Sequence, residues 1–205
     1  MATAPDHARQ GTPHQYRAVR EFVQSMDDTL PGKFEITREG IVHDMRSPGR
    51  QHELTVLRLR KRLEKVMPEE LVAHTGEPDV EDAAEGVMRH PDVMVIAEAD
   101  MEGDGAFDPR TLIAAVEVVS RSNPENDWVG KIRDYPLLGI PVCAVFDPRT
   151  GSGAVFTDIH PTPAGPRYAT RKDFVYGEEV TIAEWTIPTD GLPRYADDST
   201  TQGAS

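Results

Sequence analysis

Apolar residues recur at helical spacing in an early part of the chain. Over residues 51–67 they follow one another at intervals of three or four positions, at Val56, Leu59, Leu63 and Val66. This period predicts a helix with one apolar stripe facing a core, and Pro68 ends it because proline has no amide proton to donate. Just upstream, residues 34–45 have the pattern of two short strands joined around Glu39-Gly40, which predicts a hairpin.

Three later apolar runs have the composition of buried strands: residues 92–97, 112–119 and 142–146. The second run is apolar on both alternating faces, as is typical of a central strand that is covered on both sides. Between the second and third runs, Asn123 and Pro124 suit the start of a helix, whose body carries Trp128, Ile132 and Tyr135 at helical spacing. Strand, helix and strand in this order predict a parallel crossover.

The remaining segments complete the expected fold. Residues 151–159 and 167–182 predict a meander of exposed strands, and residues 69–89 predict an acidic loop or a weak strand. The fold class is therefore α+β or α/β, with a mixed central sheet and helices packed on it.

Length and composition narrow the class of protein further. The 205 residues fit one domain, which we expect over residues 16–192, with disordered ends at 1–15 and 193–205. No apolar run approaches the roughly 18 residues of a membrane helix, and the N-terminus lacks the apolar core of a secretion signal. We therefore expect a cytoplasmic protein. The single cysteine, Cys143, excludes an internal disulfide and a cysteine-rich zinc site.

Charge is divided unevenly along the sequence. Lys and Arg number 22 and Asp and Glu 35, which gives a formal net charge of −13. Residues 46–65 are nevertheless basic, with seven cations: Arg46, Arg50, Arg58, Arg60, Lys61, Arg62 and Lys65. This segment is either a solvated helix face or a patch that follows nucleic-acid phosphates. Residues 69–108 are strongly acidic, with Arg89 as their only Lys or Arg, and could instead dock a basic partner.

Two carboxylates, Asp92 and Glu117, stand in or at the mouth of otherwise apolar strands. Burying an unpaired carboxylate costs several kcal/mol, so such a residue needs a partner, a raised pKa or a metal. On neighbouring strands the two acids would repel each other, and a divalent cation is the simplest way to stabilise them. The alternative is that each acid pairs with a nearby arginine or caps a turn.

Four motifs follow one another in the second half of the chain. They are His-Pro-Asp92-Val-Met-Val, Val-Glu117-Val-Val-Ser120-Arg-Ser-Asn, Asp127-x-x-x-Lys131-x-x-x-Tyr135 and Gly139-Ile-Pro-Val-Cys-Ala-Val-Phe-Asp147-Pro. This combination resembles the Uma-two family of endonucleases, within the restriction-endonuclease-like PD-(D/E)XK superfamily. The resemblance covers roughly residues 30–185 and is strongest over 90–148. Glu35, Gly40 and His52 stand where the family has its hairpin and first helix.

The resemblance implies a mixed central sheet flanked by helices, with additional antiparallel strands and a metal site at one edge. Asp92 matches the metal-binding aspartate of the superfamily and Glu117 its second carboxylate. Members use Mg²⁺ or Mn²⁺ to activate water and to neutralise charge on the scissile phosphate. The superfamily usually has a lysine two residues after the second carboxylate, where this chain has Val119. Lys131 on the following helix is the best substitute, unless it only pairs with Asp127 four residues earlier.

Further candidates stand next to these motifs. Glu53, at the start of the basic helix, is either another metal ligand or an ordinary first-turn acid. Ser120 either contacts phosphate or begins the loop after the second carboxylate. His52 and His90 flank the site segments, but a lone histidine is more often structural, and neither has metal-ligand spacing.

Together these features predict a metal-dependent endonuclease that hydrolyses DNA through metal-activated water. Asp92, Glu117 and Glu53 would hold Mg²⁺ or Mn²⁺, Lys131 would balance charge, and DNA would lie on the basic face of residues 46–65. A homodimer would allow two strands to be cut. The alternative hypothesis is an inactive protein of the same fold that binds nucleic acid or a protein partner, and Val119 favours it.

Overall fold

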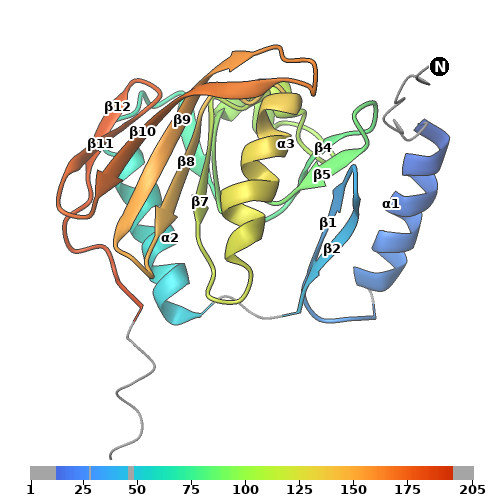
Figure 1. The fold of residues 1–205 in the computed structure, drawn as a ribbon, viewed down its shortest axis with the longest axis horizontal. Helices are drawn as coiled ribbons and strands as arrows, with labels where there is room; N and C mark the ends of the chain where they lie inside the picture. The colour runs from blue at the N-terminus through green and yellow to red at the C-terminus, as the bar shows by residue number, and fades with distance from the viewer. Residues whose placement is uncertain (1–12, 28, 46–48, 196–205) are drawn as a thin grey trace, which may run out of the picture.

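A mixed sheet of six strands forms the centre of the structure (Figure 1), a computed structural model that describes residues 13–27, 29–45 and 49–195. Its strands are β3 (Leu71–His74), β6 (Val93–Ala97), β7 (Ala114–Val118), β8 (Cys143–Asp147), β9 (Ser152–His160) and β10 (Arg167–Val175). They lie in the order β10-β9-β8-β7-β6-β3. Only β7 and β8 pair in parallel; the other neighbours are antiparallel. The predicted mixed sheet and parallel crossover are confirmed.

One face of this sheet is covered by α2 (Arg50–Leu63). The predicted stripe faces the core over most of its length, at Val56, Leu59 and Leu63. The prediction is wrong at Val66, which is 44% exposed because the helix ends at Leu63 and the chain then turns. Met67 enters the core in its place. A two-stranded sheet of β11 (Glu179–Ile182) and β12 (Trp185–Pro188) packs against the same core.

The opposite face is covered by the helical segment that follows β7. This segment begins with a π-helical turn, Asn126–Lys131, and continues as α3 (Ile132–Leu137), which lies in front of the sheet beside β7 in Figure 1. Tyr135 shares a core with Ala115 and Val119. Because side chains alternate along a strand, Glu117 of β7 also faces α3.

A second, smaller sheet lies beside the first, in the order β2-β1-β5-β4. It contains β1 (Lys33–Thr37), β2 (Gly40–Asp44), β4 (Val80–Asp82) and β5 (Val87–Arg89). The predicted hairpin is confirmed as β1 and β2, whereas residues 69–89 contain three strands rather than a loop or one weak strand. The helix α1 (Pro13–Asp27) packs on this sheet through Tyr16 and Val23.

The two ends of the described chain can be compared with the expected domain boundaries. Helix α1 begins at Pro13, inside the segment expected to be disordered, and the rest of residues 1–15 and most of 193–205 lie outside the described residues. At the other end, the Tyr195 amide donates to the Pro148 carbonyl at 2.9 Å. The single domain over 16–192 stays a prediction. Within the described ranges, no helix is long and apolar enough to cross a bilayer.

Candidate active site

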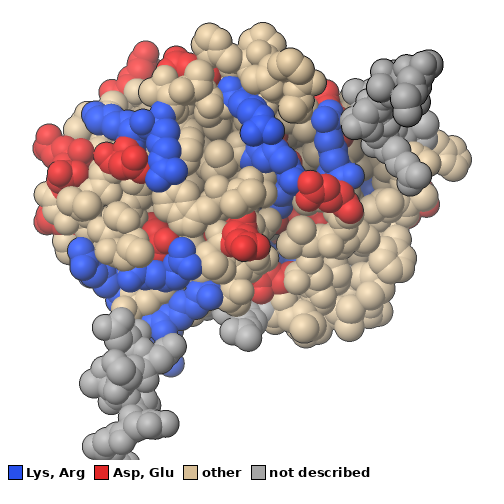
Figure 2. Space-filling view, viewed as in Figure 1, with Lys and Arg blue, Asp and Glu red and all other residues tan. Residues whose placement is uncertain are grey.

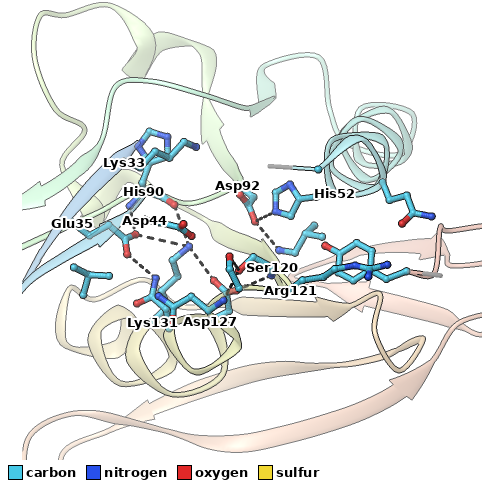
Figure 3. A pocket seen from close by; sticks show the side chains of 18 of the residues that line it. Lys33, Glu35, Asp44, His52, His90, Asp92, Ser120, Arg121, Asp127 and Lys131 are labelled. Carbon is cyan, nitrogen blue, oxygen red and sulfur yellow. Dashed lines mark hydrogen bonds and ion pairs between the residues drawn. The ribbon is translucent and has the colours of Figure 1, made fainter. Parts of the chain in front are cut away.

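A cavity of about 520 Å³ opens where the two sheets meet (Figure 3). The β1–β2 hairpin, the start of α2, the loop after β7 and the π-helical turn all contribute to its lining. Many of the lining residues are ionisable: Lys33, Glu35, Asp44, Arg50, His52, His90, Asp92, Arg121, Asp127 and Lys131. Segments that are distant in sequence therefore bring a dense set of charges to one hollow.

Lys131 lies at the centre of this charge cluster. Its buried ammonium donates to Glu117 Oε2 at 2.5 Å and to the His90 carbonyl at 3.2 Å, and it lies 3.3 Å from Asp127 Oδ1. Glu35 Oε1 is 3.9 Å away. Burial disfavours the ammonium, but the charges of Glu117, Glu35 and Asp127 raise the pKa of Lys131 well above its usual value. The lysine is therefore a fixed positive charge that pairs with Asp127 and also reaches Glu117.

Glu117 lies behind Lys131 and is fully buried, so it does not line the cavity itself. One carboxylate oxygen accepts from Lys131 and the other from the Tyr135 hydroxyl. Burial raises the pKa of Glu117 to about 8, with the charges of Asp92 and Asp127 acting in the same direction and Lys131 opposing them. Ionisation of this acid is therefore much less favourable than that of an exposed glutamate.

Asp92, just before β6, faces the cavity with 14% of its side chain exposed. Its Oδ2 accepts from the Val118 amide at 2.8 Å and lies 3.3 Å from His52 Nε2. Burial opposes ionisation, but the contact with His52 and the charge of Lys131 lower the pKa of Asp92 to about 2. The charge of Asp92 adds to the raised pKa of Glu117, of which burial is the main cause.

The π-helical turn places Asp127 and Lys131 on the buried side of the helix. Asp127 Oδ2 accepts from the Ser120 amide at 3.3 Å. Burial raises the pKa of Asp127 to about 6, although Lys131 opposes this shift. Single π turns inside helices often occur at functional sites. Here the turn lets two residues of the Asp127-x-x-x-Lys131 motif meet the end of β7.

Arg89 holds the π-helical turn and the hairpin together, and sequence reasoning missed this role. It is 1% exposed, and its guanidinium donates to Glu35 Oε2 at 2.8 Å and to Asp134 Oδ2 at 2.6 Å. A side chain at Gly130 would meet Arg89 Nη2 at 3.0 Å, so glycine permits this close approach. The signal in the sequence was a lone cation in a strongly acidic stretch.

Glu35 is a further buried acid, and the sequence analysis named it only as part of the predicted hairpin. Besides Arg89, it accepts from Asn126 Nδ2 at 2.8 Å and from the His90 amide at 3.0 Å. Burial opposes its ionisation, yet Lys131 and Arg89 hold the pKa of this carboxyl below its usual value. Glu35 thus connects the smaller sheet to the central lysine.

The other site residues predicted from the sequence lie in different environments. Glu53 is 60% exposed and does not line the cavity, so the geometry gives no support to its prediction as a metal ligand. His52 contacts Asp92, and its Nδ1 is buried with no hydrogen-bond partner in the described part of the chain. His90 Nδ1 lies 2.6 Å from Asp79 Oδ1. Ser120 lines the cavity and its hydroxyl accepts from the Asn123 amide, at the start of the helical segment.

Comparison with known proteins identifies the family and the fold. The model of the Uma2 family, described as "Putative restriction endonuclease", matches residues 19–189. The chain belongs to the Uma2 family. A crystal structure from Anabaena variabilis ATCC 29413, described as "a putative nuclease belonging to DUF820", has a TM-score of 0.58 at 15% identity. The alignment covers 80% of this chain and 87% of that one. This structural likeness shows the fold. A comparison with curated proteins finds no match to the chain.

In this Uma2 chain, a lysine reaches Glu117 from an element other than the strand that carries the acid. Val119, where the superfamily usually has lysine, is fully buried in the apolar core beneath α3. It lies on the same face of the sheet as Glu117, as alternation along the strand requires. Lys131 brings its ammonium to Glu117 from the facing helical segment instead. The position in sequence differs, but the charge lies beside the same acid.

The donor chemistry of the cluster fits a divalent cation. Four carboxylates act on the charge of Lys131: Glu35, Asp92, Glu117 and Asp127. Burial is the main cause of the raised pKa values of Glu117 and Asp127, the neighbouring carboxylates add to it, and a divalent cation bound nearby would stabilise their charged forms. Carboxylate oxygens are also the ligands that Mg²⁺ and Mn²⁺ prefer. Among the described residues, no group of three side chains is placed to hold a metal ion. The two oxygens of Glu117 accept from Lys131 and Tyr135.

Proposed function

We propose that this Uma2 chain is a divalent-metal-dependent endonuclease that hydrolyses DNA phosphodiester bonds. The observation that supports the proposal is the convergence of Asp92, Glu117 and Lys131, from two strands and a facing helical turn, beside one cavity. An acid with a strongly raised pKa next to a buried cation is typical of a functional site. The family description favours the same class of enzyme.

Each residue has a separate role in this proposal. Asp92 and Glu117 would hold Mg²⁺ or Mn²⁺, which when bound supplies charge neutralisation and an acidified water. Lys131 keeps its proton at neutral pH, so it acts as a positive charge toward the phosphate rather than as a base. Tyr135 holds the Glu117 carboxyl through its hydroxyl. Asp127 fixes the lysine from the other side.

Contact with DNA would involve cations around the cavity. In Figure 2, Lys and Arg side chains form separate groups interspersed with Asp and Glu. Within the basic segment 46–65, Arg62 donates to the carbonyls of Pro188 and Asp190, whereas Arg50 lines the cavity. We infer that Arg50 is the member of the basic face nearest to a bound phosphate. A homodimer would supply a second site for the opposite strand.

Nicking of a supercoiled plasmid tests the proposal. Mn²⁺ or Mg²⁺ should convert the plasmid, in which negative supercoiling favours local unpairing, to open circles, and EDTA should prevent this. Asp92→Asn and Lys131→Ala should each abolish nicking, while Glu98→Gln, a change at an exposed acid outside the cavity, should not. The second candidate function is binding without cleavage, which the valine at position 119 favours. If folded, metal-loaded protein binds the plasmid but never nicks it, the function is binding without cleavage.

A further inference from the structure

The cavity is small in comparison with a DNA duplex. Its volume of about 520 Å³, equal to that of a sphere about 10 Å across, lies within the range of sites for small molecules. Asp92 exposes only 14% of its side chain, and it does so into this cavity. A phosphate must therefore reach Asp92 through this cavity, whose volume suits a nucleotide rather than a segment of duplex.

An aromatic ring lies at the edge of the same cavity. Tyr195 is half-buried and lines the cavity, and its hydroxyl donates to the Val119 carbonyl at 2.8 Å. The guanidinium of Arg121, which is exposed and also lines the cavity, lies 4.8 Å above the ring centroid. These contacts fix the orientation of the ring where a nucleotide would enter.

The backbone that carries Tyr195 is also held in place. Gln51 of α2 donates to the Arg194 carbonyl at 3.2 Å, and the Tyr195 amide donates to the Pro148 carbonyl. Arg62 donates to two carbonyls slightly earlier in the segment. The ring is thus attached on both sides to the elements that form the site.

We propose that the substrate is single-stranded DNA, with one base stacked on the Arg121–Tyr195 pair while the neighbouring phosphate reaches Asp92. This inference rests on the endonuclease function proposed above. Stacking on an aromatic ring is tolerant of sequence, because every base has a π face, and a guanidinium adds a cation–π contribution. Lys33 and Arg50 are exposed and line the same cavity, where they would pair with flanking phosphates. A paired duplex would first have to extrude a nucleotide, which costs unstacking energy.

Binding measured without metal tests the strand preference. Fluorescence anisotropy in EDTA would compare a labelled single strand, free of self-complementarity, with the same sequence closed into a hairpin duplex. The single strand should bind at least about tenfold more tightly. Tyr195→Ala should weaken single-strand binding by about 5- to 150-fold, the range found when a stacked base loses its aromatic partner. Tyr195→Phe should bind like the wild type, because it keeps the ring.

A matched control pair lies outside the cavity. Arg171 lies over the Trp128 ring at 5.4 Å, and neither residue lines the cavity, so Arg171→Gln should leave binding unchanged. Equal affinity for the two DNA forms would overturn the inference. So would a loss in Tyr195→Phe as large as that in Tyr195→Ala, since Tyr195 would then act only through its hydroxyl contact.

Cleavage in Mn²⁺ separates this inference from the function on which it rests. Equal cutting of single strand and duplex would overturn the strand preference and leave the endonuclease standing. Single-strand preference in binding without any cleavage would support the strand inference and overturn the endonuclease. Absence of both binding and cleavage would overturn both.

Discussion

Replacing Glu117 with glutamine should make the metal-free protein progressively more stable than the wild type as pH rises. Glu117 is fully buried, and its pKa is raised from 4.5 to about 8. Between these two pKa values, the folded protein keeps a proton on Glu117 that the unfolded chain has already released. The free energy of unfolding therefore falls as pH rises from the unfolded pKa through the folded one. Glutamine resembles the protonated acid in shape and has no proton to lose.

The magnitude follows from the two pKa values. Their separation corresponds to at most about 5 kcal/mol, at one pKa unit per 1.36 kcal/mol. Between about pH 5 and about pH 8, the wild type should lose roughly 3.5 kcal/mol that Glu117→Gln retains. Asp127 and His52 also have raised pKa values, so their contributions have the same sign. The quantity to compare is therefore the difference between the two proteins at each pH.

Urea unfolding in EDTA, followed by tryptophan fluorescence at several pH values, measures this difference. Glu98→Gln is the matched control, because that acid is exposed, and its difference from wild type should not vary with pH. A difference for Glu117→Gln that stays constant, or that grows in favour of the wild type as pH rises, would refute the reasoning. Glu117 would then be an ordinary ionised partner of Lys131.

Three other predictions concern the metal, the lysine and the basic segment. Mn²⁺ at about 100 times its dissociation constant should raise the unfolding free energy by about 2.7 kcal/mol, and calorimetry should show that Asp92→Asn loses most of this gain. Lys131→Ala should bind Mn²⁺ in calorimetric titration at least as tightly as the wild type, since the ammonium no longer competes for Glu117. In single-turnover assays this variant should cleave about 100-fold more slowly or worse, and undiminished cleavage would remove the lysine from the mechanism. Arg50→Gln should flatten the slope of log affinity for DNA against log salt by about one unit. Arg62→Gln should lower the melting temperature with an unchanged slope, because its guanidinium holds backbone carbonyls.

The central strands and their acids were predictable because local sequence suffices to show them. An apolar run interrupted by one carboxylate, as at Glu117, is visible without any knowledge of distant contacts. Helix α1 was missed, although Tyr16, Val19, Val23 and Met26 have helical spacing, because polar, Pro- and Gly-containing sequence surrounds them.

The rest of the site depends on contacts between distant segments. Glu35 and Arg89 meet because β1 and β5 pair, and the register of that pairing is specified by no local pattern. The π-helical turn was also hidden, since Trp128, Ile132 and Tyr135 have the spacing of an ordinary α-helix. Neither helix propensity nor the spacing of apolar residues reveals one extra residue within a helical turn.

That π-helical turn constrains how the family can vary. A π turn accommodates one residue more than an α turn, so a single deletion within Asn126–Lys131 would convert it to regular helix. All following side chains would then rotate by about 100° relative to those before it. Asp127 lies at the start of the turn and Tyr135 beyond its end, so they could no longer both face β7. In this chain the length of the segment therefore determines where the Lys131 ammonium lies, and a deletion there would need a new cation beside Glu117, such as a lysine at position 119, to replace it.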